Sequence, residues 1–168
     1  MPNVKHMKWW GWGVEGVGFH HENKPGFRPF VINAIDLDVN TPPTAPVSID
    51  DLPIPAPMIS DQLLAELTDA VGTENAVQDD LDRTVHTYGK SARDLLRIRA
   101  GDLPRVPDVV VYPGDEAEVQ LIVDRAVAAD AVIIPYGGGS NISGSLHAPE
   151  DETRPVISVD LGRLNQVI

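Results

Sequence analysis

Residues 107–141 determine the fold that we expect, and they read PDVVVYPGDEAEVQLIVDRAVAADAVIIPYGGGSN. VVVY, at residues 109–112, is a short β-branched run of the kind found in strands that are buried on both faces. Asp115 is a suitable N-cap for a following helix, Glu118 completes a capping box, and an apolar stripe runs along that helix. AVIIP, at residues 131–135, is a second buried run. Strand, helix and strand in this order predict a right-handed βαβ crossover with parallel strands.

Further elements are expected on both sides of this unit. PVISVD, at residues 155–160, predicts a third strand, and we expect the first two strands to be direct neighbours. Upstream, Ser60 is a suitable N-cap for an amphipathic helix that Gly72 ends. Residues 75–104 are more polar, are helical only over residues 92–98, and are expected to be largely exposed. The expected fold class is therefore α/β (α+β), with a small parallel sheet and flanking helices.

The composition divides the chain into three parts. Eight of the 15 prolines lie between Pro25 and Pro57, and prolines at this density hold the backbone extended. We therefore expect residues 1–58 to be an extended segment rich in Trp and Pro, residues 59–106 a helical lead-in, and residues 107–168 the α/β part. With 168 residues and 42% hydrophobic content, these parts have the size and core of one domain.

The three tryptophans form a compact motif near the start of the chain. MKWWGWG, at residues 7–13, contains all of them within four positions, among glycines. Indole rings carry a large apolar area that is unfavourable in water, so the motif must pack against a surface. We expect that surface to be the protein's own body rather than a partner.

Charge and cysteine content exclude several classes of protein. The formal net charge of -12 opposes binding to nucleic acid and to anionic lipid surfaces. The absence of cysteine excludes disulfides, thiolate metal sites and cysteine nucleophiles. No apolar run approaches the length of a membrane span, and the first residues lack the pattern of a secretory signal. We therefore expect a cytoplasmic protein without a transmembrane segment.

The connection after the second predicted strand is the strongest candidate for a binding site. It reads PYGGGSNISGSLHA, at residues 135–148, and it begins at the carboxyl end of a parallel strand, where open α/β sheets bind ligands. Three successive glycines let backbone N–H groups converge on a phosphate, although they also suit a flexible turn that needs glycine for its geometry alone. The dinucleotide motif GxGxxG fails at Ile142, and the P-loop motif fails at Thr84.

Three stretches together resemble a known family. PDVVVYPGDEAEVQLIV, VIIPYGGGSNISG and VISVDLGRLNQV are similar to the FAD-binding domain of the vanillyl-alcohol-oxidase (PCMH-type) flavoproteins. Within that superfamily, MKWWGWG and LLRIRAGDLPRVPDVVVYP resemble the alkyldihydroxyacetonephosphate synthase family and its bacterial relatives. The resemblance covers most of the chain and is weakest over residues 22–56. It implies an FAD-binding flavoprotein and the first subdomain of a PCMH-type FAD-binding domain.

The resemblance also implies site residues. In the family a strand and a glycine loop hold the FAD pyrophosphate, and the matching positions here are Pro135, Tyr136, Gly137, Gly138, Gly139, Ser140 and Asn141. Some members link the flavin covalently through a histidine just after the glycines. Ser140 stands at that place, so FAD is expected to be non-covalent. Ser145 stands where a second glycine usually follows Gly144.

The chain ends at Ile168, where members of the family continue into the rest of the FAD domain and a substrate domain. We therefore expect the amino-terminal portion of a flavoenzyme, with no catalytic residue of its own. In the family, flavin assists the exchange of an acyl for an alkyl ether group on a dihydroxyacetone phosphate backbone, a step in lipid biosynthesis. Two alternatives stay open: part of an FAD-dependent oxidase or dehydrogenase of 2-hydroxy acids, and an inactive fragment that serves only association. An incomplete sheet would also favour oligomerisation through its unpaired edge.

The histidines and aspartates outside the glycine loop are expected to be structural or solvated. The pair His20 and His21 has no third ligand at a spacing that suits a metal. His86 lies in the polar stretch without an evident catalytic partner, and we expect it at the surface. His147 follows the glycine loop and is expected on the loop surface. Asp79, Asp80 and Asp82 are expected to be solvated.

Overall fold

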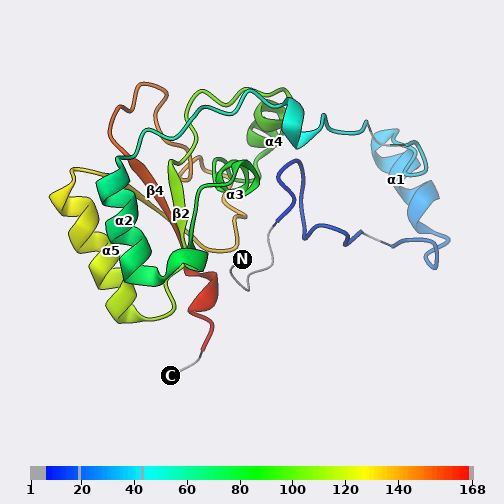
Figure 1. The fold of residues 1–168 in the computed structure, drawn as a ribbon. Helices are drawn as coiled ribbons and strands as arrows, with labels where there is room; N and C mark the ends of the chain where they lie inside the picture. Colours follow the sequence, from blue (N-terminus) through cyan, green and yellow to red (C-terminus); the bar gives the residue numbers. More distant parts are fainter. Residues whose placement is uncertain (1–6, 19, 43, 167–168) are drawn as a thin grey trace.

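The computed structural model describes residues 7–18, 20–42 and 44–166, and its centre is one four-stranded sheet (Figure 1). The strand order is β1-β2-β4-β3, where β1 pairs antiparallel with β2, and both β2 and β3 pair parallel with β4. The strands are β1 (Ala76–Val77), β2 (Val109–Val111), β3 (Val132–Tyr136) and β4 (Val156–Asp160). The prediction of a mixed α/β fold with parallel strands is confirmed.

The prediction that the first two long strands are direct neighbours is wrong. β2 and β3 each pair with β4, which lies between them. All five residues of β4 are buried, as expected for a central strand. Its backbone forms hydrogen bonds with a neighbouring strand on each side. The connection from β2 through α5 to β3 therefore skips one position in the sheet, and β4, which comes later in the sequence, occupies that position.

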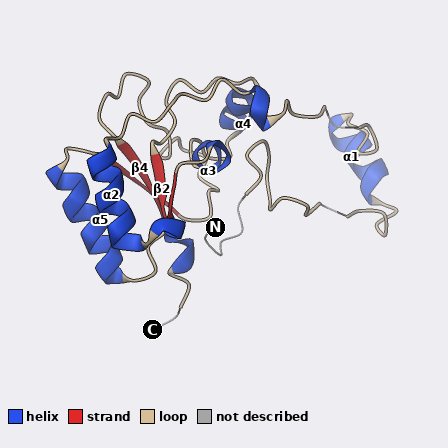
Figure 2. Ribbon diagram, viewed as in Figure 1, coloured by secondary structure: helices blue, strands red, loops and turns tan. Residues whose placement is uncertain are grey.

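Two helices cover one face of the sheet (Figures 1 and 2). They are α2 (Asp61–Val71) and α5 (Glu116–Ala128), and both predicted N-caps are present. Ser60 Oγ accepts a hydrogen bond from the Leu63 amide at 3.2 Å, and Asp115 Oδ1 accepts one from the Glu118 amide at 2.9 Å. The apolar stripes of the helices pack on the strands in one core cluster: Leu63, Leu67, Val71, Val109, Val111, Ile122, Ala126, Ile157 and Val159.

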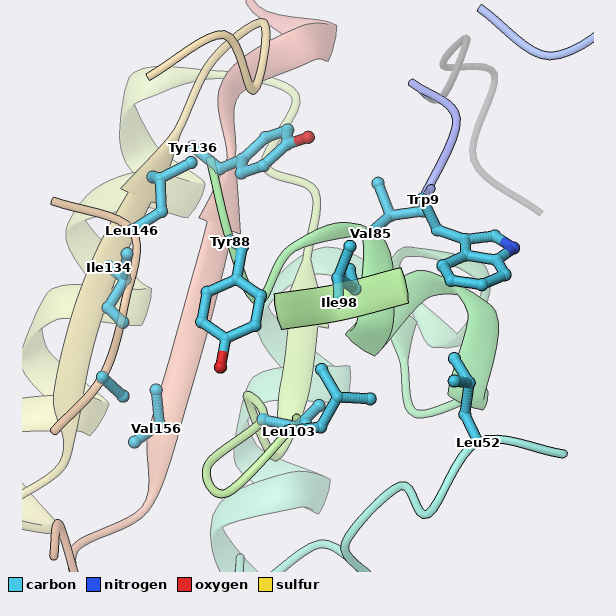
Figure 3. Packing of buried hydrophobic residues seen from close by; sticks show 12 residues of the cluster. Trp9, Leu52, Val85, Tyr88, Ile98, Leu103, Ile134, Tyr136, Leu146 and Val156 are labelled. Carbon is cyan, nitrogen blue, oxygen red and sulfur yellow. The ribbon is translucent and has the colours of Figure 1, made fainter. Parts of the chain in front are cut away.

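The opposite face of the sheet is covered by α3 (Asp80–Val85), α4 (Ala92–Arg99) and the start of the described chain. Figure 3 shows side chains of this second core, in which residues from the helices meet Ile134, Tyr136 and Val156 of the strands. The prediction that residues 75–104 are largely exposed is therefore wrong, since residues 82–90 are all buried. The sheet needs an apolar cover on this face, and Val85 and Tyr88 supply part of it within an otherwise polar stretch.

The tryptophan motif packs on the protein's own body, as expected. A bridge between Met7 and Val14 closes the motif into a hairpin, and Trp9 is 7% exposed inside the second core. Trp10 is half-buried, with the guanidinium of Arg99 5.8 Å from its ring centroid. Trp12 is 53% exposed, so the three indole rings contribute unequally to the packing.

Residues 14–58 are less regular than the rest of the described chain. This region was predicted to be extended, but it contains the helix α1 (Phe27–Ile35), which Figure 1 shows well apart from the sheet, and a short 3-10 helix (Ile49–Asp51). Phe30 and Ile35 of α1 are largely exposed. None of the helices in the described ranges is both long and apolar enough to cross a membrane.

Candidate functional site: a glycine loop at the carboxyl ends of the strands

The carboxyl ends of the three parallel strands bring a row of polar and aromatic residues together. β3 ends at Tyr136, which is paired with Asp160 at the end of β4, and Tyr112 directly follows β2. The ring of His86 lies against this row, with its centroid 4.1 Å from that of Tyr136 and 5.9 Å from that of Tyr112. Ligands of open α/β sheets bind outside this end, so the row forms the floor of the candidate site.

The prediction that His86 lies at the surface is wrong, because its ring is fully buried. Nδ1 lies 2.7 Å from the carbonyl oxygen of Asp82, and Nε2 lies 2.9 Å from Oδ2 of Asp160. Each ring nitrogen thus faces an oxygen atom, one from α3 and one from β4. The imidazole is therefore fixed between α3 and the end of β4.

Asp82 is also buried rather than solvated. Its Oδ1 accepts a hydrogen bond of 2.6 Å from the Tyr112 hydroxyl. Burial, and then this hydrogen bond to a carboxylate, raise the pKa of Tyr112 far above its ordinary range, so the phenol stays protonated. The floor of the site is therefore a fixed hydrogen-bonded cluster, which can position the loop above it.

The glycine loop begins where β3 ends and leaves a row of amides without protein partners. In the described part of the chain, the backbone N–H groups of residues 138–142 donate no hydrogen bond. A Cβ built on Gly137 or Gly138 would meet no atom within 4 Å, so these positions are open on their outer side. Backbone N–H groups beside glycines can form a nest that suits phosphate oxygens, and Gly138, Ser140 and Ile142 of this row are exposed.

Gly139 and Tyr136 are packed against each other. Gly139 has a φ of +66°, which L side chains rarely adopt, and a Cβ there would collide with the Tyr136 hydroxyl. That hydroxyl is buried and has no hydrogen-bond partner among the described residues. Burial raises the pKa of Tyr136, with Asp160 acting in the same direction, so the group remains a proton donor. An unpaired buried donor next to the amide nest is a further observation that fits a bound anionic group.

The side chain of Asn141 shapes the loop. Its Oδ1 accepts hydrogen bonds from the amides of Ser143 at 3.1 Å and Ser145 at 3.2 Å, and its Nδ2 donates to the Ser145 hydroxyl at 2.7 Å. The Asn141 carbonyl accepts a 2.6 Å hydrogen bond from the Lys90 amide. Asn141 thus stabilises the turn that presents the free amides. Ser145 belongs to the same network.

Of the remaining predicted site residues, Pro135 precedes this nest and Ser140 lies within it. Pro135 is an exposed residue of β3, and Ser140 is exposed on the loop. The seven predicted residues follow one another along the chain, and the last four of them carry amides that donate no hydrogen bond within the described residues. The donor set consists of neutral N–H and O–H groups, which suit the oxygens of a diphosphate. Among the described residues, no cluster of His, Asp and Glu could hold a metal ion.

His147 is half-buried beside the loop rather than fully at the surface. It lines a small polar cavity of about 170 Å³ with Arg93, Arg97 and the residues that follow Asn141. Burial, and then the positive charge of Arg97, lower the pKa of His147, so its neutral form is favoured. Sequence reasoning missed the contribution of Gly89 and Lys90 to the site. A single Gly-Lys pair in a polar stretch does not indicate that the Lys90 amide binds the Asn141 carbonyl oxygen of the loop.

Comparisons with known proteins agree with this geometry. Residues 107–168 match the family model described as an FAD binding domain. The chain is 30% identical to the alkyldihydroxyacetonephosphate synthase of Caenorhabditis elegans and 31% identical to that of Dictyostelium discoideum, in each case over 98% of this chain and 30% of the relative. The chain therefore spans about 30% of the length of these curated relatives.

Solved structures show the same similarity. Two structures of alkyldihydroxyacetonephosphate synthase superpose with TM-scores of 0.80 and 0.81, at 29% and 31% sequence identity. Each superposition covers 97% of this chain and 34% of the solved chain. Similarity in sequence and in fold thus extends well beyond the glycine loop, to the tryptophan motif and the helices upstream.

Proposed function

We propose that the glycine loop of this chain holds the FAD pyrophosphate. The chain is an alkyldihydroxyacetonephosphate synthase-like flavoprotein, and its residues 107–168 belong to the FAD-binding domain family. The observation that carries this proposal is the row of unpaired amides at residues 138–142 beside the open positions Gly137 and Gly138. Each charge-assisted hydrogen bond to a phosphate oxygen contributes roughly 1.5 to 3 kcal/mol.

The proposed binding is non-covalent. Ser140 stands at the family's histidine position, and a serine hydroxyl at ordinary pKa is a poor nucleophile without a neighbouring base. Tyr136 supplies its buried hydroxyl beneath the loop, and Asn141 supplies the turn geometry. FAD provides the redox and electrophilic chemistry of such an enzyme, whereas these residues bind and orient its phosphates.

For the whole protein we propose the transferase chemistry that the relatives' name indicates, the exchange of an acyl for an alkyl ether group on a dihydroxyacetone phosphate backbone. The support is the similarity over 98% of this chain to proteins of that name. In the proposed organisation, residues 1–58 are an N-terminal segment rich in Trp and Pro, residues 59–106 are the helical lead-in, and residues 107–168 are the first part of the FAD domain. None of the residues described above is assigned a catalytic role.

Calorimetric titration with FAD tests the proposed site. We expect a Kd on the order of 10 μM, since 1 μM already requires about -8.2 kcal/mol. Gly138→Val places a branched side chain on the open face of the loop and should weaken binding about tenfold or more. Gly18→Val is the matched control, because Gly18 is exposed, has no positive φ and meets no atom within 4 Å. Equal affinity of both variants for FAD would show that the loop is not the phosphate cradle.

A further inference from the structure

We propose that residues 86–90, which we term the strap, hold both ends of the glycine loop and are positioning residues for its amides. This inference rests on the proposed FAD site, because it assigns residues that set the geometry of that site. The strap follows α3, whose C-cap is His86, and all five of its residues are buried. A buried segment can hold a surface loop only through specific contacts, and the strap makes one at each end of the loop.

The first contact fixes the entrance to the loop. The His86 ring packs against Tyr136, with their centroids 4.1 Å apart and the planes tilted by 48°. His86 is itself held by Asp82 and Asp160, through 2.7 Å and 2.9 Å hydrogen bonds. Tyr136 in turn packs under Gly139, which leaves no room for a Cβ at that position. Movement of the imidazole would therefore displace the tyrosine and, with it, the centre of the loop.

The second contact fixes the exit from the loop. The Lys90 amide donates a 2.6 Å hydrogen bond to the carbonyl oxygen of Asn141. Gly89 allows this approach, because a Cβ at that position would collide with the same carbonyl group. The Asn141 side chain then holds the turn that follows. The glycine at position 89 is thus explained by its contact with Asn141, 52 residues later, rather than by local backbone strain, since its φ is not positive.

The strap also joins the loop to the tryptophan hairpin. Lys90 Nζ donates a 2.7 Å hydrogen bond to the carbonyl oxygen of Lys8, next to Trp9. The side chain of Lys90 therefore holds the hairpin while its backbone holds the loop. This arrangement explains why a polar segment is buried here: its polar groups are used to connect two parts of the chain that are remote in sequence.

Gly89→Ala tests the strap, with amide NMR spectra of the folded chain as the first measurement. The added methyl must push the Asn141 carbonyl away, so we expect altered chemical shifts at the amides of residues 138–142 in the absence of FAD. We also expect affinity for FAD to fall about tenfold, since the amides no longer converge at hydrogen-bond distance. Leu67→Ala, a cavity variant on the opposite face of the sheet, is the control for stability alone. It should lower the thermal midpoint and leave both readouts unchanged.

The two proposals fail in different ways. Unchanged loop amides in Gly89→Ala would overturn the strap, whether or not the chain binds FAD. Failure of the unmodified chain to bind FAD would overturn the proposed function, while the amide shifts would still decide on the strap. If Gly89→Ala does not fold, scalar coupling across the hydrogen bond from the Lys90 amide to the Asn141 carbonyl in the unmodified chain decides instead. Detection of the coupling supports the strap, and its absence overturns it.

Discussion

Nε2 of His86 lies 2.9 Å from Oδ2 of Asp160, although 74 residues separate them along the chain. The contact ties the C-cap of α3 to the last residue of β4. Both side chains are almost completely buried, at 0% and 3% exposure. Oδ1 of Asp160 also accepts a hydrogen bond from the Gly162 amide, at 2.7 Å. Together with the hydrogen bonds of Arg83 to Pro107 and Pro55 and of Tyr112 to Asp82, this contact fixes α3 and the segment that holds the glycine loop.

Loss of the His86 ring should destabilise the fold strongly. His86→Leu leaves the Asp160 carboxylate buried without its imidazole partner, and breaking a buried pair in this way costs about 3 to 5 kcal/mol. Asp160→Asn should cost less, because the amide keeps an oxygen acceptor without a buried charge. Denaturant titration measures the free energy of unfolding. Arg28→Ala breaks the exposed pair with Asp38 and should leave that free energy nearly unchanged. A His86→Leu effect as small as that of Arg28→Ala would contradict the assignment.

Lys90 should make stability rise with pH in alkaline solution. Burial lowers its pKa from 10.5 to about 8. Between these two values the unfolded chain binds a proton that the folded chain has lost, so the free energy of unfolding increases with pH, by up to about 3 kcal/mol. Below pH 8 both states are protonated and Lys90 adds no pH dependence.

The measurement compares the unmodified chain with Lys90→Met over pH 7 to about 10.5. Burial raises the pKa of Tyr88 from 10.0 to about 12. Above about pH 10 the unfolded chain loses this phenol proton while the folded chain keeps it, so the free energy of unfolding falls as the pH rises. Both chains share that effect, so the difference between them isolates Lys90. Parallel stability curves for the two chains would show that the ammonium is not buried in the folded protein.

The tryptophans should contribute to stability in proportion to their burial. Trp9→Ala removes a ring that is 7% exposed within a core cluster, and truncations of this kind cost about 3 to 5 kcal/mol. Trp12→Ala removes a ring that is 53% exposed and should change stability by about 0.5 kcal/mol or less. Variants that retain only Trp9 or only Trp12 should differ in fluorescence, with blue, poorly quenched emission from Trp9. Equal quenching by acrylamide would contradict the docked hairpin.

Local sequence patterns predicted the elements better than their arrangement. The capping residues Ser60 and Asp115 and the apolar runs in β2 and β3 act over a few residues, so they can be recognised from the sequence alone. The insertion of β4 between β2 and β3 depends on which strand can form backbone hydrogen bonds and side-chain packing with two neighbouring strands at once. That choice is made by long-range pairing, which no local pattern records.

The buried polar segment was missed for a related reason. Arg83 is 1% exposed because its guanidinium donates to the carbonyl oxygens of Pro107 and Pro55, at 2.8 Å and 2.5 Å. These acceptors come from distant parts of the chain, so the local sequence does not reveal them. Composition alone indicates that a charged residue such as Arg83 lies on a solvated face. The glycine loop was found because its glycines directly follow a recognisable strand. The residues that hold it, His86 and Gly89, carry no such local signal.

The affinity for FAD should increase with salt at low ionic strength. The chain carries a formal net charge of -12, which repels a dianionic cofactor over a distance of about 30 Å at 0.01 M salt and about 8 Å at 0.15 M. The amide nest acts at hydrogen-bond distance and is screened much less. Calorimetric titrations at several NaCl concentrations should therefore show a Kd that falls a few-fold and then levels off. A Kd that rises steadily with salt would show instead that exposed cations such as Arg93 dominate the binding, and that the neutral amides of residues 138–142 are not its main determinant.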